Sequence, residues 1–289
     1  MLQHKPKPVN SIESLRSRVD RFFRPPTKRS NARSQLPLDL PLTINVENLF
    51  NNPSKNIAEF MDFITDAMPD GDVYLFGGII RDLALLGRKG FNSDIDVVVE
   101  GNWSNCVTYL EYLGARKNKF GGYRLKVDDW PVDIWNAKET WAIKQGLVQY
   151  RGVVSLTETT VLNWDAILMN WRTRAFIYPN NYFESLRSRM LGIVLEQNPD
   201  PLGMAMRVFR HLCLKEANTI TLKAIEYLVN CTKTYHFDEI RDREFRSYGN
   251  SLISPAVYKF FEDFKVNEML DIRSTNSIVS HILKKEFHL

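Results

Sequence analysis

The sequence predicts an α+β fold, with a small mixed sheet followed by an all-helical region. Two observations support this prediction. Between residues 73 and 178, short apolar runs typical of strands alternate with segments of helical spacing. Beyond about residue 199 only the helical spacing remains. Because alternating strands and helices pack as a sheet with helices on it, we expect a head domain over residues 41–197 and a helical domain over 198–289.

The elements of the head domain follow from the same spacing. A helix is expected within residues 45–68, where Ile57, Phe60, Met61 and Ile64 recur at helical intervals. Two hairpins are expected, one turning at Asp128-Asp129 and the other at residues 172–174. The expected strands are 73–76, 95–99, 123–127, 132–135, 167–171 and 175–178, and the expected helices between them are 79–86 and 106–113. In the helical domain we expect helices at 202–217, 221–229, 255–264 and 277–285.

Residues 1–40 differ from the rest in composition and charge. They are rich in Pro and Ser, and they carry nine Lys/Arg against three acidic residues, a net +6 in a chain whose total is +4. We expect a flexible arm there, with a short helix at 12–23. Such an arm suits attraction to the phosphates of nucleic acid, while a solvated leader without a partner is an equal alternative. An organelle-targeting leader is disfavoured by the early acidic residues and by Pro25-Pro26.

Overall composition is that of an ordinary globular protein, with 44% apolar and 25% charged residues. No apolar run approaches the roughly 20 residues that span a bilayer, and the N-terminus lacks a signal-peptide core. The cysteines, Cys106, Cys213 and Cys231, are too far apart for a metal-binding motif and are expected to be core residues in a reducing compartment. We therefore expect a cytoplasmic protein without a membrane segment.

Two glycines and two aspartates form the main candidate for chemistry. Gly77 and Gly78 lie between an expected strand and an expected helix, where backbone N–H groups can approach a phosphate. Asp94 and Asp96 lie two residues apart on the next strand, so both side chains project from one face. Closely spaced carboxylates repel unless a cation lies between them, and hard oxygen ligands favour Mg²⁺ or Mn²⁺. Each half alone has a structural explanation, but together they predict a metal–triphosphate site.

A third acid, Asp133, interrupts an otherwise apolar strand at residues 131–135. A lone buried charge is costly, so this side chain either faces water or joins the metal site. Three carboxylates around divalent ions would activate an acceptor hydroxyl and offset charge on departing pyrophosphate.

These residues resemble the head domain of the polymerase β-like nucleotidyltransferases, and more narrowly the bacterial poly(A) polymerase and class II CCA-adding family. The similarity extends from about residue 73 to residue 210. It is most specific in Gly-Gly-x-x-Arg-Asp-x-x-Leu-Leu-Gly followed by Asp-x-Asp, over residues 77–96. Residues 120–122 with 132–134, 160–163, 178–186 and 200–210 resemble later family segments. The resemblance implies catalytic roles for Asp94, Asp96 and Asp133, with metal held by Asp94 and Asp96, and nucleotide-binding roles for Gly77, Gly78, Arg81, Asp82, Asn163 and Arg207.

Two family segments are altered. The Arg-Arg-Asp that precedes the Asn segment falls on Thr157-Glu158-Thr159, and the base-reading motif falls on residues 199–203. Aligning Arg207 and Arg210 with the family places Met204 where it has its base-reading Arg. The metal site is therefore expected to be kept and the CTP/ATP-selecting template to be lost. Arg207 and Arg210 share a helix face that meets either nucleotide, RNA or solvent.

We therefore expect a metal-dependent nucleotidyltransferase that moves NMP from NTP to an acceptor hydroxyl, with an RNA 3′ end as the favoured acceptor and tRNA as one candidate. Transfer to a protein side chain, as in toxin–antitoxin or phage-defence relatives, is the alternative within the enzyme class. A catalytically silent nucleotide- or RNA-binding module is the alternative outside it. The tryptophans at 130, 135, 141, 164 and 171 are expected to pack in the core rather than to stack on bases.

Overall fold

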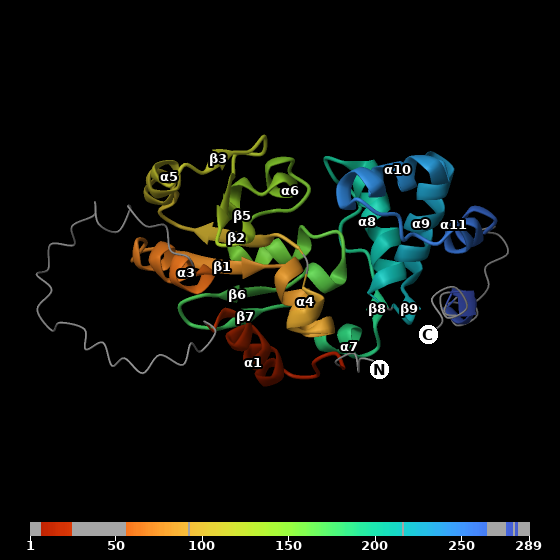
Figure 1. Cartoon of the computed structure of the whole chain (residues 1–289), viewed down its shortest axis with the longest axis horizontal. Coiled ribbons are helices and arrows are strands. Elements are labelled where there is room, and N and C mark those ends of the chain that lie inside the picture. Colours follow the sequence, from red (N-terminus) through yellow and green to blue (C-terminus); the bar gives the residue numbers. More distant parts are fainter. Residues whose placement is uncertain are drawn as a thin grey trace, which may run out of the picture.

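The structure is a computed structural model that describes residues 7–24, 56–91, 93–215, 217–264, 276–279 and 281–282. A sheet with helices on it lies beside a group of helices formed by the C-terminal part of the chain (Figure 1). The α+β class and the order of its two parts are as predicted. Most of the expected arm and the first half of the helix expected at 45–68 lie outside the described residues.

The sheet has seven strands in the order β3-β4-β5-β2-β1-β6-β7. Only β2 and β5 run parallel, so the sheet is mixed, as predicted. The strands are β1 (Asp72–Phe76), β2 (Ile95–Glu100), β3 (Arg116–Lys117), β4 (Tyr123–Val127), β5 (Trp130–Asn136), β6 (Leu168–Asn170) and β7 (Phe176–Ile177). Alternation along β2 sends Val97 and Val99 to one face and Val98 to the other.

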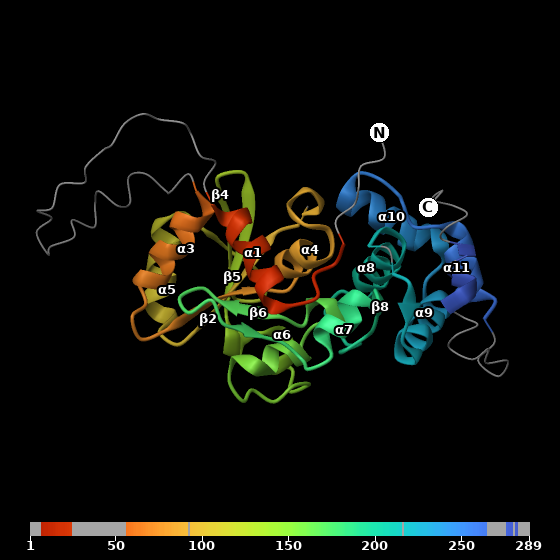
Figure 2. The same ribbon diagram turned by 90° about the horizontal axis from the view of Figure 1, so that it is seen from below.

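The two faces of the sheet are covered unequally. Helices α3 (Ile57–Asp66), α4 (Gly78–Leu86) and α5 (Trp103–Tyr112) pack on the face of Val97 and Val99 and form the main core. The opposite face carries the short helix α6 (Trp141–Lys144) and the 3-10 segment at Val153–Glu158, which make a smaller core around Val98. Figure 2 shows α1, α3 and α4 on one side of the sheet and α6 on the other.

Helix α1 (Ile12–Phe23) has the predicted bounds, but it does not belong to a flexible arm. Its apolar side is fully packed in the main core, through Leu15, Val19, Phe22 and Phe23. The Arg18 guanidinium donates to the carbonyls of Leu83 and Ala84 at 3.0 and 2.9 Å, near the end of α4. The arm prediction is therefore corrected for residues 7–24, because spacing of the apolar residues outweighs the basic composition. Arg18, one of the basic residues expected to contact nucleic acid, instead makes its hydrogen bonds within the fold.

The C-terminal part contains α8 (Pro201–Leu214), α9 (Leu222–Thr234), α10 (Phe237–Tyr248) and α11 (Pro255–Glu262). Side chains of Asp200, Thr221 and Ser254 accept from backbone N–H groups in the first turns and so fix where three of these helices begin. The predictions for α8, α9 and α11 are confirmed, although α10 was not predicted. Of the helix expected at 277–285, residues 276–279 and 281–282 are helical and the others lie outside the described residues.

One short strand pair joins the two parts. Strand β8 (Met190–Leu191) runs parallel to β9 (Thr219–Ile220), which lies beyond residue 199 where no strand was expected. All three cysteines are buried and none of them forms a disulfide, as expected of core residues. Within the described ranges, no helix has both the length and the apolar character needed to cross a membrane.

Candidate active site

The site begins where β1 meets α4. Gly77 has a φ of +60°, and its N–H donates to the carbonyl of Ile167 at 3.0 Å. A side chain is strained at this φ, and a Cβ there would lie 3.4 Å from the carbonyl oxygen of Asp165, so the turn favours glycine. Helix α4 then starts at Gly78 with no side chain capping its N-terminus. Its first-turn N–H groups are the donors that the sequence predicted for a phosphate.

Strand register brings the three predicted carboxylates together. Asp96 on β2 lies opposite Asp133 on the parallel strand β5 and opposite Phe76 on β1. Asp94 precedes Asp96 by two residues and projects toward the same side of the sheet. The side chain of Arg124 contacts both Asp94 and Asp133, which shows that these two carboxylates lie on one side. All three lie on the thinly covered face, beyond the small core around Val98. The site can therefore be reached from solvent at Asp94, whose side chain is 42% exposed.

Asp96 lies in the most unfavourable electrostatic position of the three. Burial and the neighbouring carboxylate of Asp133 raise the pKa of Asp96 to about 7. The positive charge of Arg207 opposes this shift, whereas Asp94 and Asp165 add to it. Negative charge is therefore concentrated around Asp96 and lacks full compensation from the protein.

Arg124 is the principal cation of this cluster, and the sequence analysis missed it. Its Nε donates to Asp133 at 2.8 Å, while its Nη2 donates to both Asp133 and Asp94 at 2.5 Å. Register explains the contact, because Arg124 lies opposite Asp133 across the β4–β5 hairpin. The two-residue turn at Asp128-Asp129 was itself predicted, so counting back from it could have identified the pair.

Arg81 and Asp82 lie beneath the site rather than on its surface. Arg81 is 6% exposed and donates to Asp82 at 2.8 Å and to Asp165. Asp82 is 1% exposed and also accepts from Lys215, directly after α8, at 2.9 Å. Its carboxylate thus faces the end of α8, and the role expected for Asp82 on the nucleotide side stays a prediction. Arg81 braces Asp165, a further acid near Asp96 that the sequence analysis also missed.

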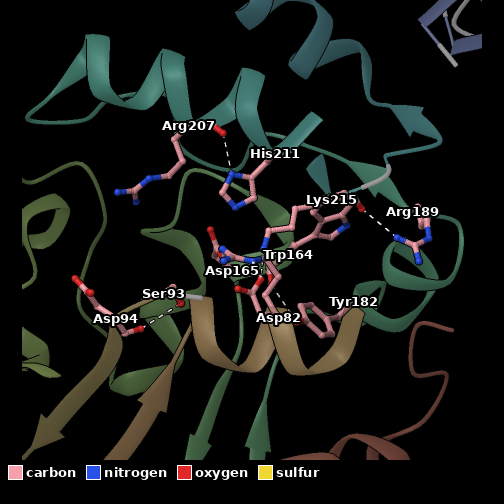
Figure 3. A network of polar contacts seen from close by, with 11 residues as sticks. Asp82, Ser93, Asp94, Trp164, Asp165, Tyr182, Arg189, Arg207, His211 and Lys215 are labelled. Carbon is pink, nitrogen blue, oxygen red and sulfur yellow. Dashed lines mark hydrogen bonds and ion pairs between the residues drawn. The ribbon is translucent and has the colours of Figure 1, made fainter. Parts of the chain in front are cut away.

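Helix α8 lies above the site, and its residues Arg207 and His211 differ in their surroundings (Figure 3). Arg207 is exposed and extends toward the side on which Asp94 lies, and its expected contact with the nucleotide stays a prediction. His211 is buried, and its Nδ1 is 2.8 Å from the carbonyl of Arg207. Burial, together with the charges of Arg81 and Lys215, holds the pKa of His211 well below its usual range, so it is neutral.

Arg210 does not share the role of Arg207. It donates to Glu244 and Asn250 and lies 4.0 Å above the ring of Tyr248. These contacts hold α10 against α8, so the predicted common face of Arg207 and Arg210 does not form one binding surface.

The side chain of Asn163 makes its hydrogen bonds within the fold. Its Nδ2 donates to the carbonyl of Met190 at 2.9 Å, and its Oδ1 accepts from the N–H of Gly192 at 2.8 Å. Both polar atoms of the amide hold the chain near β8. The contact of Asn163 with a nucleotide sugar, implied by the family resemblance, stays a prediction.

The residues fit a divalent cation in their chemistry. Asp94 and Asp96 offer hard oxygen donors, and the raised pKa of Asp96 marks uncompensated negative charge that a cation would relieve. Among the described residues, no three His, Cys, Asp or Glu side chains are already arranged as a metal-binding group. Asp94 is turned to Arg124 instead. A metal held by Asp94 and Asp96 would therefore compete with Arg124 for the Asp94 carboxylate.

No protein-family model and no curated protein matches the chain. Among solved structures, a CCA-adding enzyme with CTP is similar at 16% identity and a TM-score of 0.49, covering 75% of this chain and 53% of that one. The Thermotoga maritima CCA-adding enzyme complexed with tRNA is similar at 18% identity and a TM-score of 0.48, covering 74% and 52%.

A tRNA nucleotidyltransferase complexed with a primer tRNA and an ATP analogue is similar at 15% identity and a TM-score of 0.46, covering 71% of this chain and 64% of that one. The chain thus spans about half the length of the first two structures and somewhat more of the third. At these identities, a functional conclusion has to come from the side chains of this chain itself.

Proposed function

We propose that this protein is a nucleotidyltransferase that transfers NMP from an NTP to an acceptor hydroxyl and releases pyrophosphate. One observation supports it above the others: Asp94, Asp96 and Asp133 converge on one sheet face beside the uncapped N-terminus of α4. Acidic oxygens beside a phosphate-binding helix end are what phosphoryl and nucleotidyl transfer requires.

The nucleotide would lie between α4 and α8. Its triphosphate would accept from the first-turn N–H groups after Gly77, while Arg207 supplies positive charge from the opposite side. Asp94 and Asp96 would hold Mg²⁺ or Mn²⁺, which neutralises charge on the triphosphate and on departing pyrophosphate when bound. Arg81 and Asp165 would keep the floor of the site rigid, because both are held in one buried ion pair.

Asp133 is the residue that we assign to the acceptor. The acceptor oxygen would form a bond to the α-phosphorus as the bond from that phosphorus to the bridging oxygen breaks. The proton of the hydroxyl would pass to the Asp133 carboxylate, which first has to release at least one hydrogen bond from Arg124. Orientation of the two reactants would supply much of the rate.

For the acceptor we propose an RNA 3′ end, with tRNA as the first RNA to test. The support is the motif resemblance over residues 77–96 and the site's open side at Asp94. The loss of the base-reading motif at 199–203 leaves the nucleotide to be identified by experiment. Met204, which takes the place of the family's base-reading Arg in the alignment, is buried in the core.

A silent binding module is the second candidate, and Arg124 is the observation that favours it. Its ion pairs with two of the three acids neutralise charge that a catalytic metal would otherwise neutralise. The expected alternative of transfer to a protein side chain uses the same site and differs only in the acceptor.

One labelling experiment separates these functions. Purified protein is incubated with Mg²⁺, total RNA and each of the four α-labelled NTPs in turn, beside an Asp94→Ala/Asp96→Ala variant. Label on RNA that the variant fails to produce supports the proposed function, and label on protein supports the alternative acceptor. Absence of label on any acceptor, with intact NTP binding, would overturn the proposal in favour of the silent module.

A further inference from the structure

A basic pocket outside the carboxylate cluster has no role in the function proposed above. It lies between the turn at residues 117–121, which joins β3 to β4, and α6, and we call it the turn pocket. Its volume is about 380 Å³, within the range of small-molecule sites. Besides the turn, it is lined by Trp141, Lys144 and Gln145.

The turn pocket carries positive charge and aromatic surface together. Three of its lining residues are lysines, Lys117, Lys119 and Lys144, and no lining residue is acidic. Lys144 is paired with Glu139 at 2.6 Å. For Lys117 and Lys119, no acidic partner lies within salt-bridge distance in the part of the chain that the structure describes. Two lysines are therefore available to phosphates.

Phe120 is presented to solvent by a rigid turn. The Asn118 side chain accepts from the N–H groups of Phe120 and Gly122 at 2.9 and 3.1 Å, and Asn118 also exchanges backbone hydrogen bonds with Gly121 and Gly122. The Phe120 side chain on this fixed backbone is 41% exposed. Lys119 lies 4.9 Å from the centre of its ring. An apolar ring held in water beside a cation is a platform on which a base can stack.

The turn pocket opens on the same sheet face as the carboxylates. A Cβ at Gly122 would lie 2.9 Å from the Cβ of Trp135, which follows Asp133 by two residues and therefore shares its face. Along β4, Arg124 lies two residues after Gly122, which is about 7 Å of extended chain. An acceptor strand that ends at Asp133 can therefore run along β4 and reach Phe120 within a few nucleotides.

We propose that the turn pocket binds single-stranded RNA, stacking a base on Phe120 and contacting the adjacent phosphates through Lys117 and Lys119. The inference rests on the proposed function only in making this RNA the acceptor strand. An acidic peptide would satisfy the lysines, but it would leave the exposed Phe120 ring without a partner. A duplex would keep its bases stacked inside the helix, so a single strand fits both features.

The test is the affinity of the full chain for a short fluorescein-labelled single-stranded RNA, measured by anisotropy without NTP and with EDTA present. Phe120→Ala should weaken binding by about 5- to 100-fold, the usual effect of losing one stacked base. Lys117→Ala/Lys119→Ala should lower the slope of log K against log salt by about 1.4, as expected for two lost phosphate contacts.

Matched variants elsewhere control for lost aromatic surface and lost charge. Phe245→Ala removes a 61% exposed ring from α10, and Lys126→Ala removes a 67% exposed lysine from the far end of β4. Both should bind as the wild type does. Equal losses in these controls, unchanged binding in the turn-pocket variants, or displacement of the RNA by poly-glutamate as effective as by unlabelled RNA would each overturn the inference.

The outcome is independent of the proposed reaction. If the Phe120-dependent binding is found while no NTP label is transferred, the inference stands and the proposed function fails. If label is transferred to RNA while the turn-pocket variants bind normally, the proposed function stands and the inference fails.

Discussion

At the scale of single residues, the negative charge of Asp96 is unfavourable for the stability of the fold. Its pKa of about 7 in the folded chain, compared with about 4 for an exposed aspartate, means that ionisation near neutral pH is unfavourable there. The largest cause is burial, and the second is Asp133 on the adjoining strand. Such a position has no benefit for folding, so its most direct explanation is a cationic ligand.

Asp96→Asn should therefore stabilise the metal-free protein while it abolishes transfer. The unfolded chain loses its Asp96 proton near pH 4 and the folded chain near pH 7, so this residue lowers the unfolding free energy as pH rises through that window. At pH 8 the unfolding free energy of the variant should exceed that of the wild type by about 1–3 kcal/mol, and at pH 4 the difference should vanish. Urea unfolding in EDTA at both values measures this. Asp129→Asn, with its side chain 90% exposed, is the control and should show no such pH dependence. A variant less stable than the wild type at pH 8 would contradict the prediction.

Arg124 is predicted to compete with metal. Because it holds both Asp94 and Asp133, its removal increases their mutual repulsion and frees their oxygens. Arg124→Met should bind Mn²⁺ more tightly than the wild type, as measured by the loss of free-ion signal in electron paramagnetic resonance. The metal-free stability should fall by less than about 1 kcal/mol, because the guanidinium is 55% exposed and such pairs contribute little.

Arg124→Lys keeps the charge and should retain most of the wild-type behaviour toward Mn²⁺. Weaker Mn²⁺ binding in Arg124→Met would mean that Arg124 orients the carboxylates for metal and does not compete with it.

At the scale of elements, α1 packs against α4 and against the aromatic residues beside it. Phe22 makes edge contacts with Phe23 and Phe91, with ring centres 5.0 and 5.1 Å apart, and a tilted contact with Trp130. Arg18 adds hydrogen bonds to carbonyls near the end of α4. The helix that presents Gly78 to the site is therefore supported by residues far before it in the chain.

Phe22→Ala should lower the unfolding free energy by about 3–5 kcal/mol, the usual result of removing a buried aromatic side chain. Thermal unfolding followed by circular dichroism measures this change. Ser17→Ala, at an exposed position of the same helix, should leave the midpoint unchanged. A small effect of Phe22→Ala would indicate that α1 packs on the domain without stabilising it.

The elements also show what sequence patterns reveal. The buried strands β1 and β2 have runs of apolar and β-branched residues, so they were located to within one residue. Helix α10 buries only Ile240 and Glu244, and such a weak apolar side has no clear helical period. Strands β8 and β9 have two residues each, too few for alternation to be seen.

The same limit applies to the candidate site. Asp94, Asp96 and Asp133 could be proposed as one cluster because each lies within or directly before a strand with a clear local pattern. Lys215 and Asp165 were missed, since their partners lie 133 and 84 residues away in the chain. No local spacing encodes such contacts; they depend on how α8 and the segment before β6 pack against α4.

At the scale of the whole molecule, a buried ionic network joins the sheet to the C-terminal helices. Asp82 on α4 accepts from Lys215 after α8, and both are largely buried, with side chains 1% and 17% exposed. Arg81 links the same carboxylate to Asp165, which contributes to the raised pKa of Asp96. The junction between the two parts is therefore continuous with the candidate site. A movement of α8 would change the ion pairs of Asp82 and Arg81 and, through Asp165, the charge around Asp96.

Lys215→Met should weaken this junction. Arg81 continues to pair with Asp82, so the loss should be about 1–3 kcal/mol, below the cost of isolating a buried charge. The six tryptophans lie between residues 103 and 171, so their fluorescence reports mainly the sheet part, whereas far-ultraviolet circular dichroism reports helices in both parts. In urea, the two signals should coincide for the wild type and separate for Lys215→Met, with the helical signal changing at lower urea. Lys233→Met, an exposed position on α9, should keep them coincident. Coincident curves with an unchanged midpoint in Lys215→Met would show that the two parts are held together by apolar contacts alone, and the route from α8 to Asp96 would then have to run through packing and not through charge.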